Sequence, residues 1–170
     1  MSDTTNVLEA TTISKFFPGV KALDQVSISL KRGEVLALVG ENGAGKSTLT
    51  KILSGIHRPN PESGDIVLDG EKVNFRNSQE AKDHGLVTIY QELSLVPGLT
   101  VAENIFLGNL PQTKTGLIDW PELNRHSGEI LSELGLDVGP EDIVGNLSIS
   151  RQQMVEIARA LSRGTKVIIF

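Results

Sequence analysis

Hydrophobic and polar positions alternate along the first thirty residues of the chain. The alternation is clearest at Val26, Ile28 and Leu30, and Pro18-Gly19 separates two such runs, 7–17 and 22–30. A period of two is typical of strands with one buried face, and Pro-Gly is a turn signal. The sequence therefore predicts an antiparallel strand pair, followed by a turn at 31–34.

Two other segments contain a continuous run of apolar residues. Residues 35–39 read Val-Leu-Ala-Leu-Val, and residues 166–170 read Lys-Val-Ile-Ile-Phe. Continuous apolar strands are typical of parallel sheets, whose strands are buried on both faces. We predict a buried strand at each place. Between them, Asp69-Gly70 predicts a hairpin joining 66–68 to 72–75, and Gly85 ends a short helix at 78–84 before a strand at 86–90.

After residue 91 the apolar spacing becomes helical, which predicts helices at 100–107, 121–134 and 150–162. Ser150 and Gln153 have the spacing of a capping box at the start of the third helix. The residues expected to share a buried face are Leu123, Ile130, Leu131 and Leu134 on the second helix and Met154, Ile157, Ala158 and Leu161 on the third. The chain is thus predicted to be an α/β protein with a mostly helical insertion.

Residues 40–47 read Gly-Glu-Asn-Gly-Ala-Gly-Lys-Ser, between the predicted strand 35–39 and a helical segment. In this setting the pattern is a phosphate-binding loop. Glycines let backbone N–H groups converge on an anion, Lys46 adds a cation, and Ser47 offers a hydroxyl to Mg²⁺. The residues predicted to hold the phosphates of a nucleotide are Gly40, Glu41, Asn42, Gly43, Ala44, Gly45, Lys46, Ser47 and Thr48.

The composition of the chain excludes several classes of protein and of binding site. The 170 residues suit one domain, and a net charge of -5 argues against a general nucleic-acid binder. Without cysteine there is no disulfide and no zinc–thiolate site. The polar N-terminus does not resemble a secretory signal, and no apolar stretch approaches the length of a membrane span. We expect a cytoplasmic protein, with His57, His84 and His126 on the surface.

Four segments, 15–27, 39–56, 90–108 and 147–161, resemble the ATPase subunits of ATP-binding cassette transporters, specifically those of bacterial monosaccharide importers. The resemblance covers nearly the whole chain. It implies a P-loop NTPase (RecA-like) core with an antiparallel β subdomain and a helical insertion, truncated at the Walker B strand. The implied parts are 1–90, 91–164 and 165–170.

The resemblance also implies roles for single residues. Phe17 matches the aromatic residue that stacks on adenine, although from the residues alone Phe16 and Phe17 are interpreted as core. Gln91 matches the glutamine that contacts Mg²⁺ and orients the attacking water. Ser148 is the second residue of Leu-Ser-Ile-Ser-Arg (147–151), at the place of the family's signature segment, and is expected to contact a γ-phosphate bound by a second subunit. A simpler interpretation is that Ser148 and Ser150 only cap a helix.

The implied catalytic residues are therefore Gln91, Lys46 and Ser148, with Ser47 and Gln91 at the metal. The implied partners are membrane permease subunits, a second nucleotide-binding domain and, indirectly, an extracellular or periplasmic sugar-binding protein, with no nucleic acid. The resemblance also implies that the protein is cytoplasmic and associates with the inner face of the cell membrane. The family's Asp-Glu pair would follow Phe170, so we expect this polypeptide to bind nucleotide with negligible turnover. The alternatives are a small-molecule kinase and a non-catalytic nucleotide-binding module.

Overall fold

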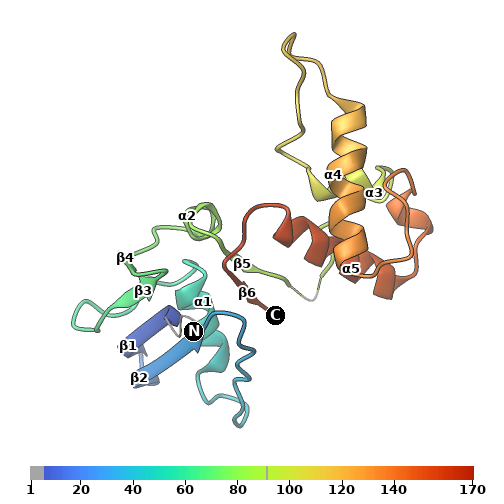
Figure 1. Ribbon diagram of the computed structural model, residues 1–170. Helices are drawn as coiled ribbons and strands as arrows, with labels where there is room; N and C mark the ends of the chain where they lie inside the picture. Colours follow the sequence, from blue (N-terminus) through green and yellow to red (C-terminus); the bar gives the residue numbers. More distant parts are fainter. Residues whose placement is uncertain (1–5, 91) are drawn as a thin grey trace. The chain divides into compact units, whose positions relative to one another are not determined.

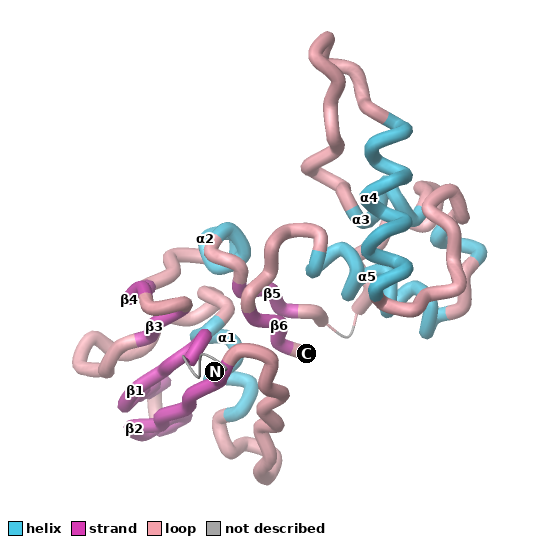
Figure 2. Tube along the Cα trace, in the orientation of Figure 1, coloured by secondary structure: helices cyan, strands magenta, loops and turns pink. Residues whose placement is uncertain are grey.

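The computed structural model describes residues 6–90 and 92–170. The chain divides into two compact units. The first, called here the strand unit, runs to Thr88 and includes Lys166–Ile169; the second, called the helical unit, comprises Ile89–Thr165 and Phe170. Figure 1 labels the helices and strands of both units. Figure 2 shows that the strands belong to the strand unit, whereas the long helix α4 belongs to the helical unit.

A four-stranded antiparallel sheet forms most of the strand unit. Its strands are β1 (Asn6–Phe17), β2 (Val20–Lys31), β3 (Ile66–Leu68) and β4 (Glu71–Val73), in the order β2-β1-β3-β4. The hairpin predicted around Pro18-Gly19 is confirmed, with Phe17 paired to Val20. The predicted turn at Asp69-Gly70 is also confirmed, and its two residues have φ angles of 55° and 82°. Such angles are required by the type I′ turn, which suits the twist of a two-residue hairpin.

Helix α1 (Lys46–Leu53) provides the residues that fill the core of the strand unit. Leu49, Ile52 and Leu53 are buried together with β-strand residues such as Ile13. A second, two-stranded sheet pairs β5 (Leu86–Thr88) with β6 (Val167–Ile169) in parallel. Helix α2 (Ser78–Asp83) precedes β5 and is capped by the side chain of Asn77. The elements predicted at 78–84, 86–90 and 166–170 are thus confirmed in shorter form, but the burial predicted for the last is not, because in β6 only Val167 is buried and the following Phe170 is 81% exposed.

The strand predicted at 35–39 is wrong. Residues 34–41 have no regular structure and are exposed, with Val35 96% and Val39 91% accessible. Sequence apolarity is not sufficient for a parallel strand, since its N–H and C=O groups need a neighbouring ladder and its faces need cover. Among the described strands, β5 pairs with β6 and no strand pairs with 35–39.

Asp69 joins the hairpin turn to β6 through ion pairs. Its carboxylate contacts Arg32, from the turn after β2, and Lys166 Nζ at 2.8 Å. The hydrogen bond from Lys166 lowers the pKa of Asp69, and the charge of Arg32 acts in the same direction. The carboxylate is partly exposed, so its contribution to stability is modest.

We expect the strand unit to lose this contribution in acid. Because the pKa of Asp69 is lower in the folded than in the unfolded chain, the stabilisation is complete above the unfolded pKa of about 3.9 and disappears as the pH falls through the folded value. Urea unfolding midpoints measured from neutral pH to pH ~3 should therefore fall less steeply in Asp69→Asn than in the wild type. Asp24→Asn, which removes an exposed pair with Lys21 on the same unit, is the control. Parallel slopes in wild type and Asp69→Asn would exclude this role.

Three α-helices and a 3-10 turn make the helical unit. They are α3 (Val101–Ile105), α4 (Trp120–Glu133), the turn η1 (Val144–Asn146) and α5 (Ile149–Leu161). Their core contains Val101, Ile105, Leu131, Val144, Val155 and Ala158. The three predicted helices are confirmed, and the predicted face of α4 is correct because Leu123 and Leu131 are buried and Ile130 and Leu134 pack against the core.

Two details of α5 differ from the prediction. The residues buried on it include Val155, Ala158 and Ala160, whereas Leu161 is 41% exposed. Val155 and Ala158 belong to the core that also contains Val101 and Ile105 of α3, so packing against other elements, and not the bulk of the apolar residues, sets the buried face. The predicted capping box at Ser150 is wrong because α5 begins earlier, at Ile149, and its cap is Ser148. A capping box exists instead at Thr100 and Glu103, at the start of α3.

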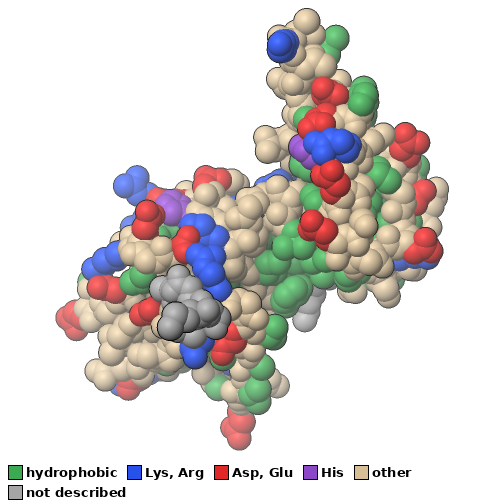
Figure 3. All heavy atoms as spheres, viewed as in Figure 1, with side chains coloured by type: hydrophobic (Ala, Val, Ile, Leu, Met, Phe, Trp, Pro, Cys, Tyr) green, Lys and Arg blue, Asp and Glu red, His purple; other side chains and the backbone are tan. Residues whose placement is uncertain are grey.

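The exposed face of α4 carries a charged cluster, visible in Figure 3 as adjoining blue, red and purple side chains. Arg125 contacts Glu122 at 2.7 Å and Glu129 at 2.6 Å, and His126 Nε2 lies 3.1 Å from Glu122. Hydrogen bonding to Arg125 lowers the pKa of Glu122.

Among the described helices, none combines the length and the apolarity needed to cross a bilayer.

Candidate nucleotide-binding site

The start of α1 differs from the start of every other described α-helix. Its first residue follows Gly45, which has a φ of 86° and supplies no side-chain cap, and its first turn contains no acidic residue. Helix N-termini leave N–H groups unsatisfied and carry the positive end of the helix dipole. The other helices cover theirs with the side chains of Asn77, Thr100, Asp119 and Ser148. The N–H groups at the start of α1 are therefore oriented to receive an anion.

The loop before α1 is closed by its own polar groups. The N–H of Ala44 donates to the carbonyl oxygen of Glu41 at 3.2 Å. Lys46 Nζ donates to the carbonyl oxygens of Gly40 and Glu41, at 2.7 and 2.8 Å. These bonds hold the ammonium over the loop, at the same end of α1 as the uncapped N–H groups. The lysine charge and the helix dipole thus act on one small region.

Gly45 allows this loop to approach β2. A Cβ atom added at Gly45 would lie 2.8 Å from Leu23 Cδ2 and closer still to the carbonyl oxygen of Ala22. Both the positive φ and the close approach require glycine. The hairpin and the loop are consequently held in one fixed arrangement within the strand unit.

A pocket of about 350 Å³ lies where the hairpin meets the loop. Phe17, Val20 and Ala22 line it from the hairpin, and Asn42, Gly43, Gly45, Lys46, Ser47 and Thr48 line it from the loop and α1. Its volume is within the range of small-molecule sites. The structure thus places Phe17 beside the segment 42–48, although about 25 residues separate the two along the sequence. Gly40, Glu41 and Ala44 are exposed loop residues that do not line this pocket.

The interpretation of Phe16 and Phe17 as core residues is wrong. Phe16 is 44% exposed and Phe17 37% exposed, because both lie at the turn end of the hairpin. The ring of Phe17 meets His57 edge-on, with centroids 5.6 Å apart, and Lys15 Nζ lies 5.4 Å from its centroid. Phe17 therefore offers ring surface to the pocket, whereas Phe16 does not line it.

Ser148 does not line this pocket. Gln91 lies outside the described residues. Ser148 belongs to the helical unit, where its Oγ accepts a hydrogen bond from the N–H of Arg151 at 3.4 Å as the cap of α5. The interpretation of Ser148 as a helix cap is confirmed, and its contact with a phosphate stays a prediction. Ser150 lies within α5 and is not its cap.

Sequence reasoning missed a polar contact made by Ser94, three positions after Gln91 in the sequence. Glu156, on α5 and only 7% exposed, accepts hydrogen bonds through Oε1 from both the N–H and the hydroxyl of Ser94, each at 2.7 Å. Arg159 Nη1 donates to the carbonyl oxygen of Ser94 at 3.2 Å, and burial lowers the pKa of Arg159. All the polar groups of Ser94 are thus bonded to α5. The sequence feature that could have indicated this contact is a glutamate, Glu156, placed between the apolar residues Val155 and Ile157 of a predicted helix.

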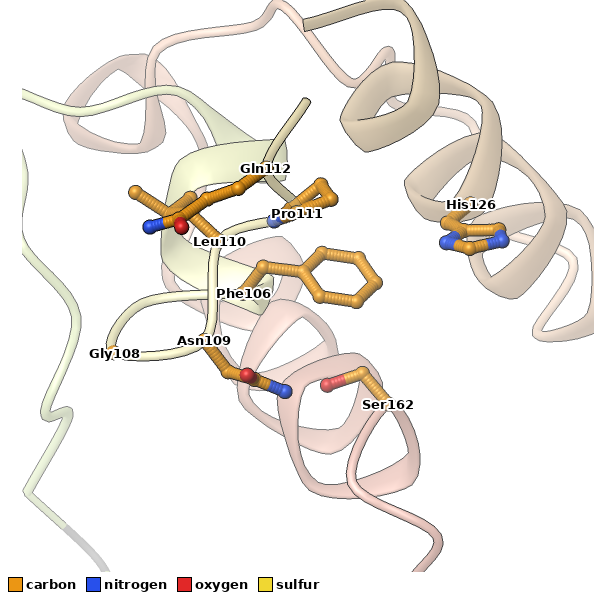
Figure 4. A pocket seen from close by; sticks show the side chains of 8 residues that line it. All are labelled: Phe106, Gly108, Asn109, Leu110, Pro111, Gln112, His126 and Ser162. Carbon is orange, nitrogen blue, oxygen red and sulfur yellow. The ribbon is translucent and has the colours of Figure 1, made fainter. Parts of the chain in front are cut away.

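A wider hollow of about 820 Å³ lies in the helical unit (Figure 4). The rings of Phe106 and His126 face each other there, with centroids 6.2 Å apart and an angle of 29° between their planes, and Asn109 and Ser162 lie below Phe106 in this view. Of the predicted site residues that the structure describes, none lines it. In the part of the chain that the structure describes, no group of three or more His, Cys, Asp and Glu side chains could hold a metal ion.

Comparisons with known proteins agree with this geometry. The family model described as ABC transporter matches residues 23–170. The chain is 53% identical, over 163 residues, to the ribose import ATP-binding protein of Rhodopirellula baltica and to a xylose import ATP-binding protein of Thermoanaerobacter pseudethanolicus. Each alignment covers 96% of this chain and 32% of the relative. The chain therefore spans about a third of the length of these relatives.

Solved structures support the fold. An ATP-binding cassette of an ABC transporter, in its ADP conformation, superposes with a TM-score of 0.79 at 28% identity, covering 97% of this chain and 68% of that one. A nucleotide-free cassette superposes with a TM-score of 0.75 at 29% identity, covering 96% of this chain and 68% of that one. The expected α/β fold of the P-loop NTPases is thereby confirmed. Together, the loop at 40–47, the superposition and the family match show that this chain belongs to the ABC transporter family.

Proposed function

We propose that this chain binds Mg-ATP between Phe17 and the loop at 40–48. The observation that carries the proposal is the shared pocket, in which the uncapped start of α1, the Lys46 ammonium and the Phe17 ring are adjacent. The first two suit a polyphosphate and the third suits a purine ring. Ser47, exposed at the second position of α1, is the proposed hydroxyl ligand of Mg²⁺.

We propose further that the chain is the first part of an ATPase that drives monosaccharide import. The names of the relatives, which import ribose and xylose, support this. In that protein Gln91 orients the attacking water, and Ser148 contacts a γ-phosphate bound by a second nucleotide-binding domain. The expected partners are permease subunits, with a sugar-binding protein acting through them, at the inner face of the membrane.

The test is calorimetric titration of the 170-residue chain with Mg-ATP and with inorganic triphosphate. We expect Mg-ATP to bind with a Kd of roughly 1 to 100 μM. Phe17→Ala should weaken Mg-ATP binding by about tenfold, because stacking on an aromatic ring contributes about 1–3 kcal/mol per base. The same change should leave inorganic triphosphate unaffected, since that ligand has no base.

Phe16→Ala is the matched control, because Phe16 is a neighbouring exposed phenylalanine that does not line the pocket. Equal effects of the two substitutions on Mg-ATP would refute the assignment of Phe17. Absence of any heat of binding from folded wild-type protein would refute the nucleotide site itself.

A further inference from the structure

The tip of the phosphate loop contains an unusual dipeptide, Asn42-Gly43. The sequence has nine asparagines, and this is the only one followed by glycine. The two residues occupy the corners of the turn closed by the bond between Ala44 and Glu41, and both are exposed. Gly43 has a φ of 89°, and a Cβ added there would meet no atom within 4 Å. The peptide bond between them is therefore open to solvent and to local rearrangement.

An asparagine in such a place can react with its own backbone. The nitrogen of the next residue attacks the side-chain carbon Cγ and forms a five-membered succinimide. The bond between Cγ and the side-chain nitrogen breaks, and that nitrogen leaves as ammonia with the proton of the attacking amide. Water then opens the ring at either carbonyl, which yields aspartate or isoaspartate. Water is the only co-reactant, and no electron is transferred.

The attacking nitrogen must be unhindered and free of hydrogen bonds. Glycine offers no Cβ to block the approach and reaches backbone angles that other residues avoid. Within the described residues, the N–H of Gly43 donates to no backbone carbonyl, and the side-chain hydrogen bonds of the loop are made by Lys46 and not by Asn42. Both reacting groups at this position are thus available.

Several other asparagines are protected in different ways. Asn60 precedes Pro61, which has no N–H to react. Asn104 is buried and its amide makes four hydrogen bonds, and the amide of Asn77 caps α2. Asn109 is the informative comparison, because it is exposed in a loop but precedes Leu110, whose side chain obstructs the approach.

We propose that Asn42-Gly43 is a self-modification site, at which the backbone nitrogen of Gly43 converts Asn42 to aspartate and isoaspartate. The product places a carboxylate in the pocket that Lys46 and Ser47 line. One consequence rests on the proposed function: the new charge repels a polyphosphate and weakens nucleotide binding. Conversely, a bound phosphate accepts the N–H of Gly43 and slows the reaction. The loop is thereby inactivated only while it holds no nucleotide.

The conversion is measured by incubating the whole chain without nucleotide at mildly alkaline pH and following ammonia release and the mass of each asparagine peptide. We expect Asn42 to convert at least about tenfold faster than Asn109, a difference of about 1.4 kcal/mol in activation free energy. Gly43→Ala should slow conversion at position 42 by a similar factor. Asn42→Gln, which keeps Gly43 and the fold of the turn, should remove the ammonia released from this site. Equal rates at Asn42 and Asn109 would overturn the proposal, as would an unchanged rate of ammonia release from Asn42→Gln.

A separate titration tests the consequence. Asn42→Asp should bind Mg-ATP at least about tenfold more weakly than the wild type. Asn109→Asp adds the same charge in the helical unit and should bind normally. Saturating Mg-ATP should also slow the conversion of Asn42 in the wild type. If Asn42→Asp binds as well as Asn109→Asp, the inactivation is refuted. If the wild type itself binds no Mg-ATP, the proposed function fails, while the conversion rate still decides the modification.

Discussion

Lys46→Met should weaken Mg-ATP binding by about a hundredfold, which corresponds to about 2.7 kcal/mol. Lys46 Nζ now donates to the carbonyl oxygens of Gly40 and Glu41, both neutral acceptors. A phosphate oxygen is charged, and a hydrogen bond between two charged groups is shorter and stronger than one with a neutral partner. Methionine keeps the length and the apolar stem of the side chain, so the substitution removes mainly the charge. Calorimetric titration measures the effect.

The substitution should change stability little. Gly40 and Glu41 are exposed, so their carbonyl oxygens can bond water when the ammonium is absent. Lys51→Met is the matched control, since Lys51 is an exposed lysine in the last turn of the same helix. A Lys46→Met protein that binds Mg-ATP as tightly as Lys51→Met would exclude this lysine from the site. Equal urea midpoints in the two variants ensure that the comparison concerns binding and not folding.

The parts of the fold that sequence predicts well are those decided by neighbouring residues. Pro18-Gly19 and Asp69-Gly70 each specify a turn through their backbone preferences, and the alternation beside them specifies which face is buried. The phosphate loop is of the same kind, because its glycines, lysine and serine act within eight residues. These elements appear in the structure where they were expected.

Prediction fails where distant residues decide. The apolar run at 35–39 has the composition of a strand, but a strand also needs a partner, and Val35 and Val39 remain exposed. The two phenylalanines are apolar enough for a core, but their position at the hairpin end leaves them accessible. In each case the residue types suit a buried position, but whether other parts of the chain cover them cannot be predicted from residue type. Phe17 could be placed beside the loop only through resemblance to a known family.

Buried polar contacts are hidden from sequence for a related reason. Glu156 and Ser94 are bonded although 62 positions separate them, and neither belongs to a recognisable motif. Together with Arg159, this contact attaches the segment after Gln91 to the helix that Ser148 caps. Ser94 is therefore held to the helix that Ser148 caps by side chains that no pattern singled out.

Asn104→Leu should destabilise the helical unit by about 3 kcal/mol, the second large effect that we expect. Asn104 is fully buried on α3. Its Oδ1 accepts from the N–H of Val96 at 2.7 Å, and its Nδ2 donates to the carbonyl oxygens of Val96 at 3.0 Å, Thr100 at 2.9 Å and Leu99 at 3.4 Å. Leucine fills a similar volume but satisfies none of these groups, and each unsatisfied group costs about 1–3 kcal/mol if it stays buried.

Thermal unfolding followed by far-ultraviolet circular dichroism should show a midpoint lower by roughly 10 °C, given about 2–4 °C per kcal/mol for a chain of this size. Asn109→Leu is the control, because Asn109 is an exposed loop residue of the same unit and should shift the midpoint by less than about 2 °C. Similar midpoints in the two variants would show that the chain between Val96 and Thr100 is held by its own turn. Because Asn104 bonds backbone groups on both sides of Pro97-Gly98, we expect the amide instead to be what orders that segment.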